Sequence, residues 1–348
     1  MSETLKFLYR QFFLTPPKAN VEKSNLRGQT GIVTGSNIGL GFEASRQLLE
    51  LGLSHLILAV RSKEKGNNAR IELAREAPGA KIEVWDLNMS NYESISQFTQ
   101  RCATLPRLDF AILNAGIFKP ELEINKVTGH EEVVQVNYLS TALLAIQLLP
   151  VMDKKNSTRS RPGTITIVGS ETAEWAMFKE QKQDPIFPAF NNPKYFDMQD
   201  RYYTSKLLQE ILLIEMCRTL PSSRGIVNVV NPGFCYGSGL HAEVTTRYRA
   251  LGIVFTAIKR MIGRSTSVGA RTLVDAAVAQ GPASHGQYLS DCARYHFPPQ
   301  LSGQKGDALS KRVWNETLKE LSFANVEGIL GSMKEKEMTG KSKGDYLR

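Results

Sequence analysis

The chain has 348 residues, which is long for one domain but within the range of a single large α/β unit that carries insertions. Apolar residues make up 42% and charged residues 22%, a balance typical of a globular protein that buries a sizeable core. The formal net charge is +9, but no run of basic residues alternates with aromatic residues, so the charge does not indicate a nucleic-acid partner.

Short β-rich runs alternate with longer helical patterns through most of the sequence. The helical patterns include residues 42–51, which end at Gly52, and residues 131–149, which end at Pro150. This alternation predicts right-handed βαβ units in one doubly wound, Rossmann-type α/β domain, with seven parallel strands and helices on both faces of the sheet. The expected strands are residues 31–34, 55–60, 81–85, 108–113, 164–168, 226–230 and 287–290.

The two ends of the chain depart from this pattern. Residues 1–25 form an extension in which 5–14 are expected to be a short amphipathic helix and Pro16-Pro17 an extended linker. Packing of this helix against the domain is the favoured interpretation, and contact with a membrane surface is the alternative. Residues 26–330 are predicted to be the catalytic domain, and 331–348, which are poor in apolar residues, a mobile tail.

The cysteines bear on metal binding and on the redox compartment. They lie far apart and form no CxxC or Cys/His cluster: Cys102, Cys217, Cys235 and Cys292. This spacing predicts neither a metal site nor a disulfide framework. A reducing, cytoplasmic setting fits it best, and the N-terminus shows no secretory signal pattern.

A glycine-rich turn directly follows the first expected strand and opens a helix. Gly35, Gly39 and Gly41 would let the backbone turn tightly and approach a pyrophosphate closely. The helix N-terminus at Asn37 and Ile38 would then offer free N–H groups to the phosphates. The spacing is TGxxxGxG rather than the more familiar GxGxxG.

This spacing resembles the short-chain dehydrogenase/reductase family, and further motifs follow in that family's order. The resemblance covers about residues 28–300 and implies a nicotinamide-dependent oxidoreductase. It also implies adenine contacts at the third strand, ribose support at the fourth and a nicotinamide contact at the sixth. The motifs are Asp86-Leu87, Asn114-Ala115-Gly116, Asn137, Ser170, Tyr202 with Lys206 in YxxxK spacing, and Asn231-Pro232-Gly233.

The catalytic residues suggested by these motifs suit the reduction of a carbonyl group. Tyr202 is the expected proton donor, and Lys206 lies four residues later on the same helix face. The charge of Lys206, with that of an oxidised nicotinamide, would lower the pKa of the tyrosine. Ser170 would bind the substrate oxygen. By resemblance, Lys206 also bonds the nicotinamide ribose, and Asn137 anchors a water molecule.

The end of the second strand bears on the choice of cofactor. NAD-binding folds place an acidic residue here, but this sequence has Val60 followed by Arg61. Arginine can pair with the 2′-phosphate of NADP(H), and Lys63 lies close by. The sequence therefore predicts NADP(H) rather than NAD, with solvation of the strand end as the other interpretation of Arg61.

The region that would face the substrate carries an insertion. The 31 residues between Ser170 and Tyr202 are rich in aromatic residues, which could form a pocket wall or lid, or pack a small core of their own. The insertion is similar to that of the retinol-dehydrogenase-like branch. Residues 11–17, 59–62 and 231–235 also resemble reductases of filamentous-fungal natural-product pathways, which implies a lipophilic terpenoid or polyketide alcohol or ketone as substrate.

Two questions stay open at this level. A non-catalytic nicotinamide-binding sensor or scaffold is the alternative to an enzyme, but its expected sign is a missing Tyr or Lys in the YxxxK motif. The family often forms dimers or tetramers, so a homo-oligomer is expected by resemblance. The apolar face of residues 202–220 could serve such an interface or the core.

Overall fold

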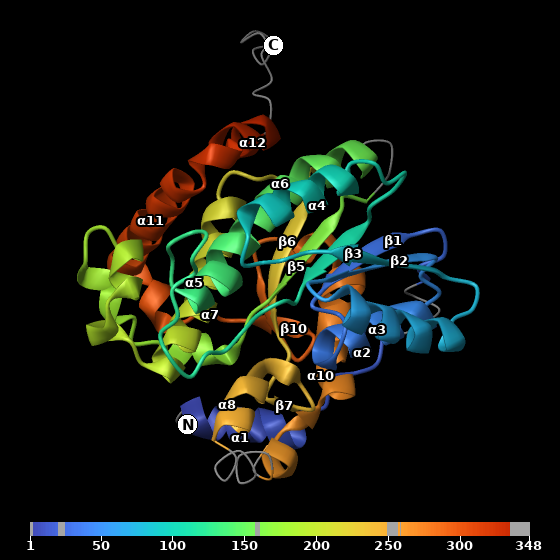
Figure 1. The fold of residues 1–348 in the computed structure, drawn as a ribbon, viewed down its shortest axis with the longest axis horizontal. Coiled ribbons are helices and arrows are strands. Elements are labelled where there is room, and N and C mark those ends of the chain that lie inside the picture. Colours follow the sequence, from blue (N-terminus) through green and yellow to red (C-terminus); the bar gives the residue numbers. More distant parts are fainter. Residues whose placement is uncertain (1–2, 20–24, 157–160, 249–256, 258, 335–348) are drawn as a thin grey trace, which may run out of the picture.

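The computed structural model describes residues 3–19, 25–156, 161–248, 257 and 259–334. A central sheet of eight strands forms its middle layer (Figure 1). The strand order is β10-β9-β6-β5-β4-β1-β2-β3, and every neighbouring pair except β10–β9 is parallel. This confirms the predicted Rossmann-type architecture. The strands are β1 (Thr30–Thr34), β2 (His55–Val60), β3 (Lys81–Asp86), β4 (Phe110–Leu113), β5 (Thr164–Val168), β6 (Ile226–Asn231), β9 (Tyr288–Ser290) and β10 (Ala293–Tyr295).

The eighth strand corrects the prediction of seven parallel strands. β10 pairs antiparallel with β9 across a tight turn at Asp291 and Cys292. Both turn residues have positive φ, 54° and 62°, which is the backbone of a two-residue hairpin. Such turns usually carry Asn or Gly, and neither residue occurs at these two positions, so the local sequence does not indicate the hairpin.

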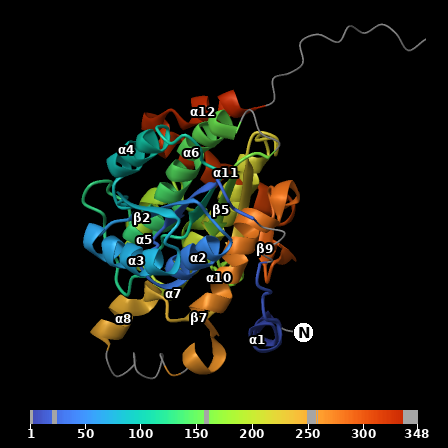
Figure 2. The ribbon, with the colours of Figure 1, turned by 90° about the vertical axis from the view of Figure 1, so that its right-hand side faces the viewer.

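Helices cover both faces of the sheet and enclose two separate hydrophobic cores. On one face pack α2 (Gly39–Glu50), α3 (Lys63–Glu76) and α10 (Thr266–Val274). The other face is covered by α4 (Tyr92–Cys102), α6 (Ser140–Asn156) and α7 (Met198–Cys217), with α11 (Gly303–Glu320) and α12 (Val326–Met333) packed outside them (Figure 2). The inner strands are nearly continuous runs of buried residues because both faces of the parallel sheet are covered there, whereas the edge strands β3 and β10 are partly exposed.

The long helical stretch before β5 differs from its predicted form. It begins as α5 (Glu132–Val134), continues through a π-helical turn (Gln135–Leu139) and then forms α6, which runs through Pro150 to Asn156. The predicted end at Pro150 is therefore wrong. The helix continues because Met152 is buried in the core and the Asn156 side chain donates to the Leu108 carbonyl at 2.8 Å. The stretch Glu132–Asn156 is long and apolar enough to cross a membrane, but 89% of its most apolar 18-residue segment is buried inside the protein.

The N-terminal extension forms a helix, α1 (Glu3–Phe13), that packs on the domain. It lies beside a small two-stranded sheet made of β7 (Cys235–Tyr236) and β8 (Arg264–Ser265) (Figures 1 and 2). The helix α8 (Ala242–Arg247) lies on the other side of β7 in Figure 2. At the other end of the chain, α12 extends into the segment predicted as a mobile tail. Residues 335–348 of that segment lie outside the described residues.

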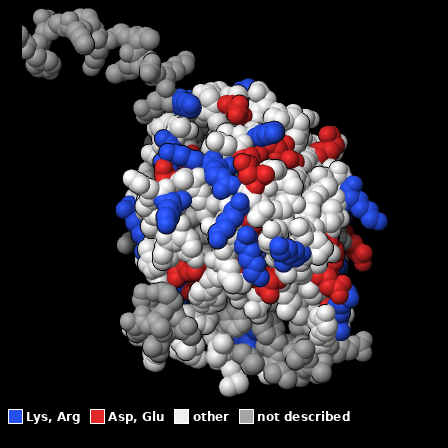
Figure 3. Space-filling model, turned by 90° about the vertical axis from the view of Figure 1, so that its left-hand side faces the viewer, with Lys and Arg blue, Asp and Glu red and all other residues white. Residues whose placement is uncertain are grey.

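The surface charge is mixed in sign on the face seen in Figure 3. Acidic side chains lie among the basic ones on this face, so the net positive charge of +9 does not form a stripe of one sign here. A continuous basic stripe is what nucleic-acid binding would require of such a face.

Candidate active site

The sequence motifs gather at one edge of the sheet, where the carboxyl ends of the parallel strands meet. β1 lies between β2 and β4, so the chain winds outward in opposite directions from this point. In doubly wound sheets, ligands bind in the crevice outside the strand ends at such a reversal. Gly35 follows β1 and Asn114 follows β4, which places both motifs on the two sides of this crevice.

The glycine-rich turn is built for close approach of the backbone to a ligand. Gly35 and Gly39 have φ values of +63° and +64°, a region that favours glycine. A Cβ at Gly41 would lie 2.6 Å from Asn114 Nδ2, so no side chain fits there. The N-cap residue of α2 is Ile38, which has no side-chain cap, so the first N–H groups of the helix are left for another acceptor. With the partly exposed Asn37, this turn fits the pyrophosphate of a dinucleotide.

The segment after β4 fastens the glycine turn in place. Asn114 donates through Nδ2 to the carbonyl oxygens of Thr34 at 3.0 Å and Gly35 at 3.2 Å. The backbone N–H of Ala115 donates to Thr34 Oγ1 at 2.9 Å. A Cβ at Gly116 would lie 3.3 Å from Asn137 Oδ1, so this glycine lets the segment approach the next site residue.

Asn137 is fully buried in the π-helical turn and links two parts of the site. Its side chain accepts from the Ile117 N–H at 2.8 Å and donates to the Ile117 carbonyl at 2.9 Å and to Ser205 Oγ at 3.0 Å. Its backbone carbonyl accepts from Gln209 Nε2 at 2.7 Å. The amide therefore joins the loop after β4 to α7, and π-helical turns of this kind often occur at functional sites.

Tyr202, Ser170 and Lys206 lie together beside the end of β5. The Tyr202 hydroxyl is hydrogen-bonded to Ser170, which follows this strand. Lys206 is one helical turn further along α7, and its Nζ lies 5.5 Å from the centre of the tyrosine ring. The lysine donates to the Val168 carbonyl at 2.8 Å and to Gln209 Oε1 at 3.2 Å. The structure therefore brings together all four residues that the sequence predicted as catalytic.

The ionisation of this group differs from the prediction in one respect. Burial raises the pKa of Tyr202, and the hydrogen bond with Ser170 partly opposes this rise. The prediction had the charges of Lys206 and of an oxidised nicotinamide lower this pKa, whereas burial is the largest cause here and raises it; Lys206 Nζ itself donates to Val168 and Gln209. Burial also lowers the pKa of Lys206 itself to about 7. The lysine can therefore gain or lose a proton near neutral pH.

The end of β2 presents positive charge where an acidic residue would bind a ribose hydroxyl. Val60 is buried in the last position of the strand, and Arg61 is exposed immediately after it. Lys63, also exposed, begins α3. Asp86 is exposed at the end of β3, and Leu87 is buried behind it, so both lie where an adenine ring would be held beside β1 and β2. Within the described part of the chain, no cluster of His, Cys, Asp and Glu could hold a metal ion.

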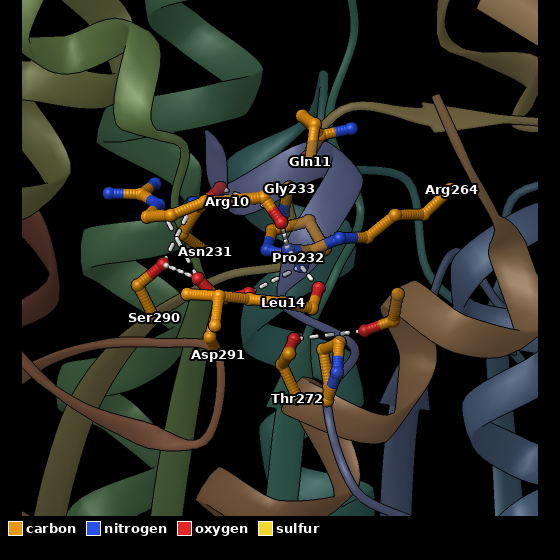
Figure 4. A network of polar contacts seen from close by, with 12 residues as sticks. Arg10, Gln11, Leu14, Asn231, Pro232, Gly233, Arg264, Thr272, Ser290 and Asp291 are labelled. Carbon is orange, nitrogen blue, oxygen red and sulfur yellow. Dashed lines mark hydrogen bonds and ion pairs between the residues drawn. The ribbon is translucent and has the colours of Figure 1, made fainter. Parts of the chain in front are cut away.

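The turn after β6 is held by residues that the sequence did not single out. Gly233 has φ +77°, and its N–H donates to Asn231 Oδ1 at 3.0 Å, with Pro232 between them. The next residue, Phe234, forms hydrogen bonds with Gln11 of α1. These partners are 223 residues apart in the chain, and no local pattern indicates their contact. Figure 4 shows Gln11 close to Gly233.

Phe118, from the loop after β4, packs against Tyr202, and His241, from the segment after the β6 turn, packs against Phe118. The Phe118 ring lies 5.5 Å from that of Tyr202 and 4.9 Å from that of His241, measured between ring centres. His241 Nδ1 is 3.1 Å from Lys259 Nζ. Burial, followed by the charge of Lys259, lowers the pKa of His241 to about 3, so the imidazole is neutral at physiological pH.

The phenylalanines of the insertion between Ser170 and Tyr202 stack on one another inside the large hydrophobic core that also contains α6 and α7. Phe178 and Phe190 stack with ring centres 5.9 Å apart, and Phe187 stacks on Phe190 at 6.4 Å. The same core encloses an ion pair of 2.8 Å between Arg201 and Glu180, both almost fully buried. These phenylalanines thus pack into the core of the domain, which the prediction of a separate small core did not foresee. Outside this core, Trp175 is partly exposed.

Comparison with known proteins bears on the family of this chain. The short chain dehydrogenase family profile matches residues 29–180. The short chain dehydrogenase/reductase mfmJ of Annulohypoxylon moriforme is 43% identical, covering 94% of both chains, and the short-chain dehydrogenase fogG of Aspergillus ruber is 42% identical, covering 94% of this chain and 95% of its own.

Solved structures share the fold at lower identity. A putative short chain dehydrogenase from Escherichia coli, complexed with NADPH, is 20% identical with a TM-score of 0.57, over 77% of this chain and 98% of that one. RhlG of Pseudomonas aeruginosa, complexed with NADP, is 22% identical with a TM-score of 0.58, over 76% and 95% of the two chains. With relatives above 40% identity along almost its whole length, this chain belongs to the short-chain dehydrogenase/reductase family.

Proposed function

We propose that this short-chain dehydrogenase/reductase uses NADP(H) to interconvert an alcohol and a ketone or aldehyde on a lipophilic small molecule. The observation that carries the proposal is the hydrogen bond between Tyr202 and Ser170, with Lys206 one turn away on α7. The complete Tyr-Lys pair argues against the alternative of a non-catalytic sensor or scaffold. The catalytic unit would be one domain over residues 26–330.

The proposed roles follow from where each atom lies. The nicotinamide, when bound, supplies the hydride chemistry at the substrate carbon. Ser170 holds the substrate oxygen, and Tyr202 delivers a proton to it, so that a carbonyl gains one hydride and one proton and becomes an alcohol. The raised pKa of Tyr202 keeps its hydroxyl protonated and therefore ready for the reductive direction. Lys206 would bond the ribose, and Asn137 holds the loop and α7 in register.

The preference for NADP(H) is supported by the charge at the end of β2. Arg61 and Lys63 are both exposed there, and Val60 leaves no carboxylate to bind a ribose 2′-hydroxyl. A guanidinium group can pair with a phosphate through two parallel hydrogen bonds, and a carboxylate at this position would repel it. The structural neighbours from Escherichia coli and Pseudomonas aeruginosa carry NADPH and NADP respectively.

A lipophilic substrate is supported by the aromatic surroundings of Tyr202 and by the relatives. Phe118 contacts the tyrosine ring, and the neutral His241 lies next to it. The relatives at 42–43% identity come from filamentous fungi, which supports a role in secondary-metabolite biosynthesis. The four cysteines are unpaired, in keeping with a reducing, cytoplasmic setting. We also propose that the protein forms a homo-oligomer and that its partner is a small lipophilic substrate.

The direct test is consumption of NADPH by the purified full-length protein with a panel of lipophilic ketones and aldehydes. We expect oxidation of NADPH with at least one polycyclic or long-chain carbonyl compound, and a lower kcat/KM with NADH. NADPH binding without turnover on any carbonyl or alcohol would favour the sensor or scaffold. Failure to bind either nicotinamide would overturn the proposal.

A further inference from the structure

Two consecutive residues of α1 each hold the residue that follows a predicted site residue. Arg10 pairs with Glu171, which comes directly after Ser170. Gln11 bonds to Phe234, which comes directly after Gly233. The N-terminal helix therefore contacts both sides of the place where hydride transfer is proposed, although 160 or more residues separate it from either side in the chain.

Gln11 acts on the backbone of the turn after β6. The side chain is buried, and its Oε1 accepts from the Phe234 N–H at 3.1 Å while its Nε2 donates to the Phe234 carbonyl at 2.9 Å. A second donation from Nε2 reaches the Ile262 carbonyl at 3.2 Å. A Cβ at Gly233 would lie 2.7 Å from Gln11 Oε1, so the amide lies directly against this glycine (Figure 4). The amide thereby satisfies both backbone groups of Phe234, as a neighbouring strand would.

Arg10 acts on the other side through a buried ionic network. Its guanidinium pairs with Glu171 and lies 3.4 Å from Asp291 Oδ2, and its side chain is only 11% exposed. Asp291 also pairs with Arg264 at 2.6 Å. Arg264 in turn donates to the backbone carbonyls of Arg10 at 2.8 Å and Leu14 at 3.0 Å, which fixes the end of α1 (Figure 4).

Apolar burial alone does not explain the orientation of α1, although Phe7 packs against Trp175 and Phe234 with ring centres 5.8 and 6.4 Å away. The helix turns Arg10 and Gln11 inward, whereas Phe12 and Phe13 are 54% and 73% exposed. Burying a guanidinium and an amide costs free energy unless every polar group finds a partner. A helix that packed only to bury apolar surface would not leave Phe12 and Phe13 exposed while it buried Arg10 and Gln11. The polar contacts of Arg10 with Glu171 and of Gln11 with Phe234 thus help to determine which face of α1 lies inward.

From this geometry we propose that Arg10 and Gln11 are positioning residues of the active site. Arg10 sets the position of Ser170 through Glu171, and Gln11 sets the turn beside the nicotinamide through Phe234. This inference rests on the proposed function, because it assigns α1 to the same catalytic centre. It predicts that the two residues affect different kinetic parameters, since one supports the substrate oxygen site and the other the cofactor site.

The test compares Gln11→Leu and Arg10→Met in the full chain, with Phe13→Ser on the exposed side of α1 as the matched control. For Gln11→Leu we expect the Kd for NADPH to rise about tenfold, because leucine cannot form the hydrogen bonds of the amide, and one net hydrogen bond of ordinary strength corresponds to roughly this change. For Arg10→Met we expect kcat to fall about tenfold while the Kd for NADPH changes less than about twofold. Phe13→Ser should leave both parameters as in the wild type.

Conservative variants keep the test decisive if either substitution impairs folding. Arg10→Lys retains the positive charge facing Glu171 and should restore part of kcat. Gln11→Glu keeps an acceptor for the Phe234 N–H but loses the Nε2 donor to the Phe234 carbonyl. If α1 had only a structural role, each substitution would lower the melting temperature, lower kcat and raise the Kd for NADPH together. That result would overturn the inference. Unchanged parameters in all variants of an active wild type would overturn it too. A wild type that neither binds nor oxidises NADPH would overturn the proposed function with it.

Discussion

Lys206 donates a hydrogen bond of 2.8 Å from its Nζ to the carbonyl oxygen of Val168, the last residue of β5. This bond ties the lysine to the strand that leads into Ser170, two residues later. Burial of the ammonium group lowers its pKa to about 7. The lysine is therefore a buried base whose charge changes near neutral pH.

This burial predicts a specific pH dependence of stability. The pKa of Lys206 is about 7 in the folded protein and its usual value is 10.5, so the unfolded chain binds more protons between these pH values. Stability must therefore rise with pH through this window. We expect the free energy of unfolding of the wild type, relative to that of Lys206→Met, to increase by about 2 kcal/mol from pH 7 to pH 9.

Urea denaturation at pH 7, 8 and 9 measures this difference. The variant Lys305→Met, which removes a lysine from the surface helix α11, is the matched control. A constant difference between wild type and Lys206→Met across the three pH values would show that burial of Lys206 does not perturb its ionisation.

The glycine turn predicts a contrast between two alanine substitutions. Gly41→Ala would place a Cβ 2.6 Å from Asn114 Nδ2 and 2.7 Å from the Gly35 carbonyl oxygen, and neither group is free to move away. We expect the Kd for NADPH to rise at least about tenfold and the protein to lose roughly 1–3 kcal/mol of stability. At Gly79 a Cβ would meet nothing within 4 Å, so Gly79→Ala should leave both quantities unchanged. Isothermal titration and urea unfolding decide between these outcomes, and equal behaviour of the two variants would contradict the proposed cradle.

The end of β2 predicts that cofactor preference can be exchanged. In the double variant Val60→Asp with Arg61→Ile, a carboxylate that can bind a ribose 2′-hydroxyl replaces the charge that would pair with a 2′-phosphate. We expect the ratio of kcat/KM for NADPH over NADH to fall by about two orders of magnitude, from the loss of one charge-assisted contact and the gain of a repulsive one. Steady-state kinetics with both cofactors measures the ratio, and an unchanged ratio would reject the role of Arg61.

Much of the fold and the candidate site could be predicted from the order of motifs along the chain. Each motif follows a strand, and the carboxyl ends of parallel strands meet at one edge of the sheet. This is why residues as distant as Gly35 and Tyr202 could be placed together without a structure. The spacing of Tyr202 and Lys206 likewise placed both on one side of α7.

The remaining features depend on tertiary contacts that leave no local pattern. The hairpin to β10 uses two residues other than glycine in left-handed conformations, and α6 passes through Pro150 because residues beyond it are buried. The direction of Lys206 Nζ is set by the Val168 carbonyl, which belongs to a different element. For the same reason the contacts of Arg10 and Gln11 with distant segments could not be read from the sequence.

The central claim is that Tyr202 transfers the proton, and the substitution Tyr202→Phe tests it most directly. This variant keeps the ring that packs against Phe118 but loses the hydroxyl that is hydrogen-bonded to Ser170. We predict that NADPH binds with a Kd within about threefold of the wild type while kcat falls by roughly 10²- to 10⁴-fold, the usual loss when a positioned acid is removed. If Tyr202→Phe bound NADPH normally and retained full turnover, the proposed mechanism would be wrong.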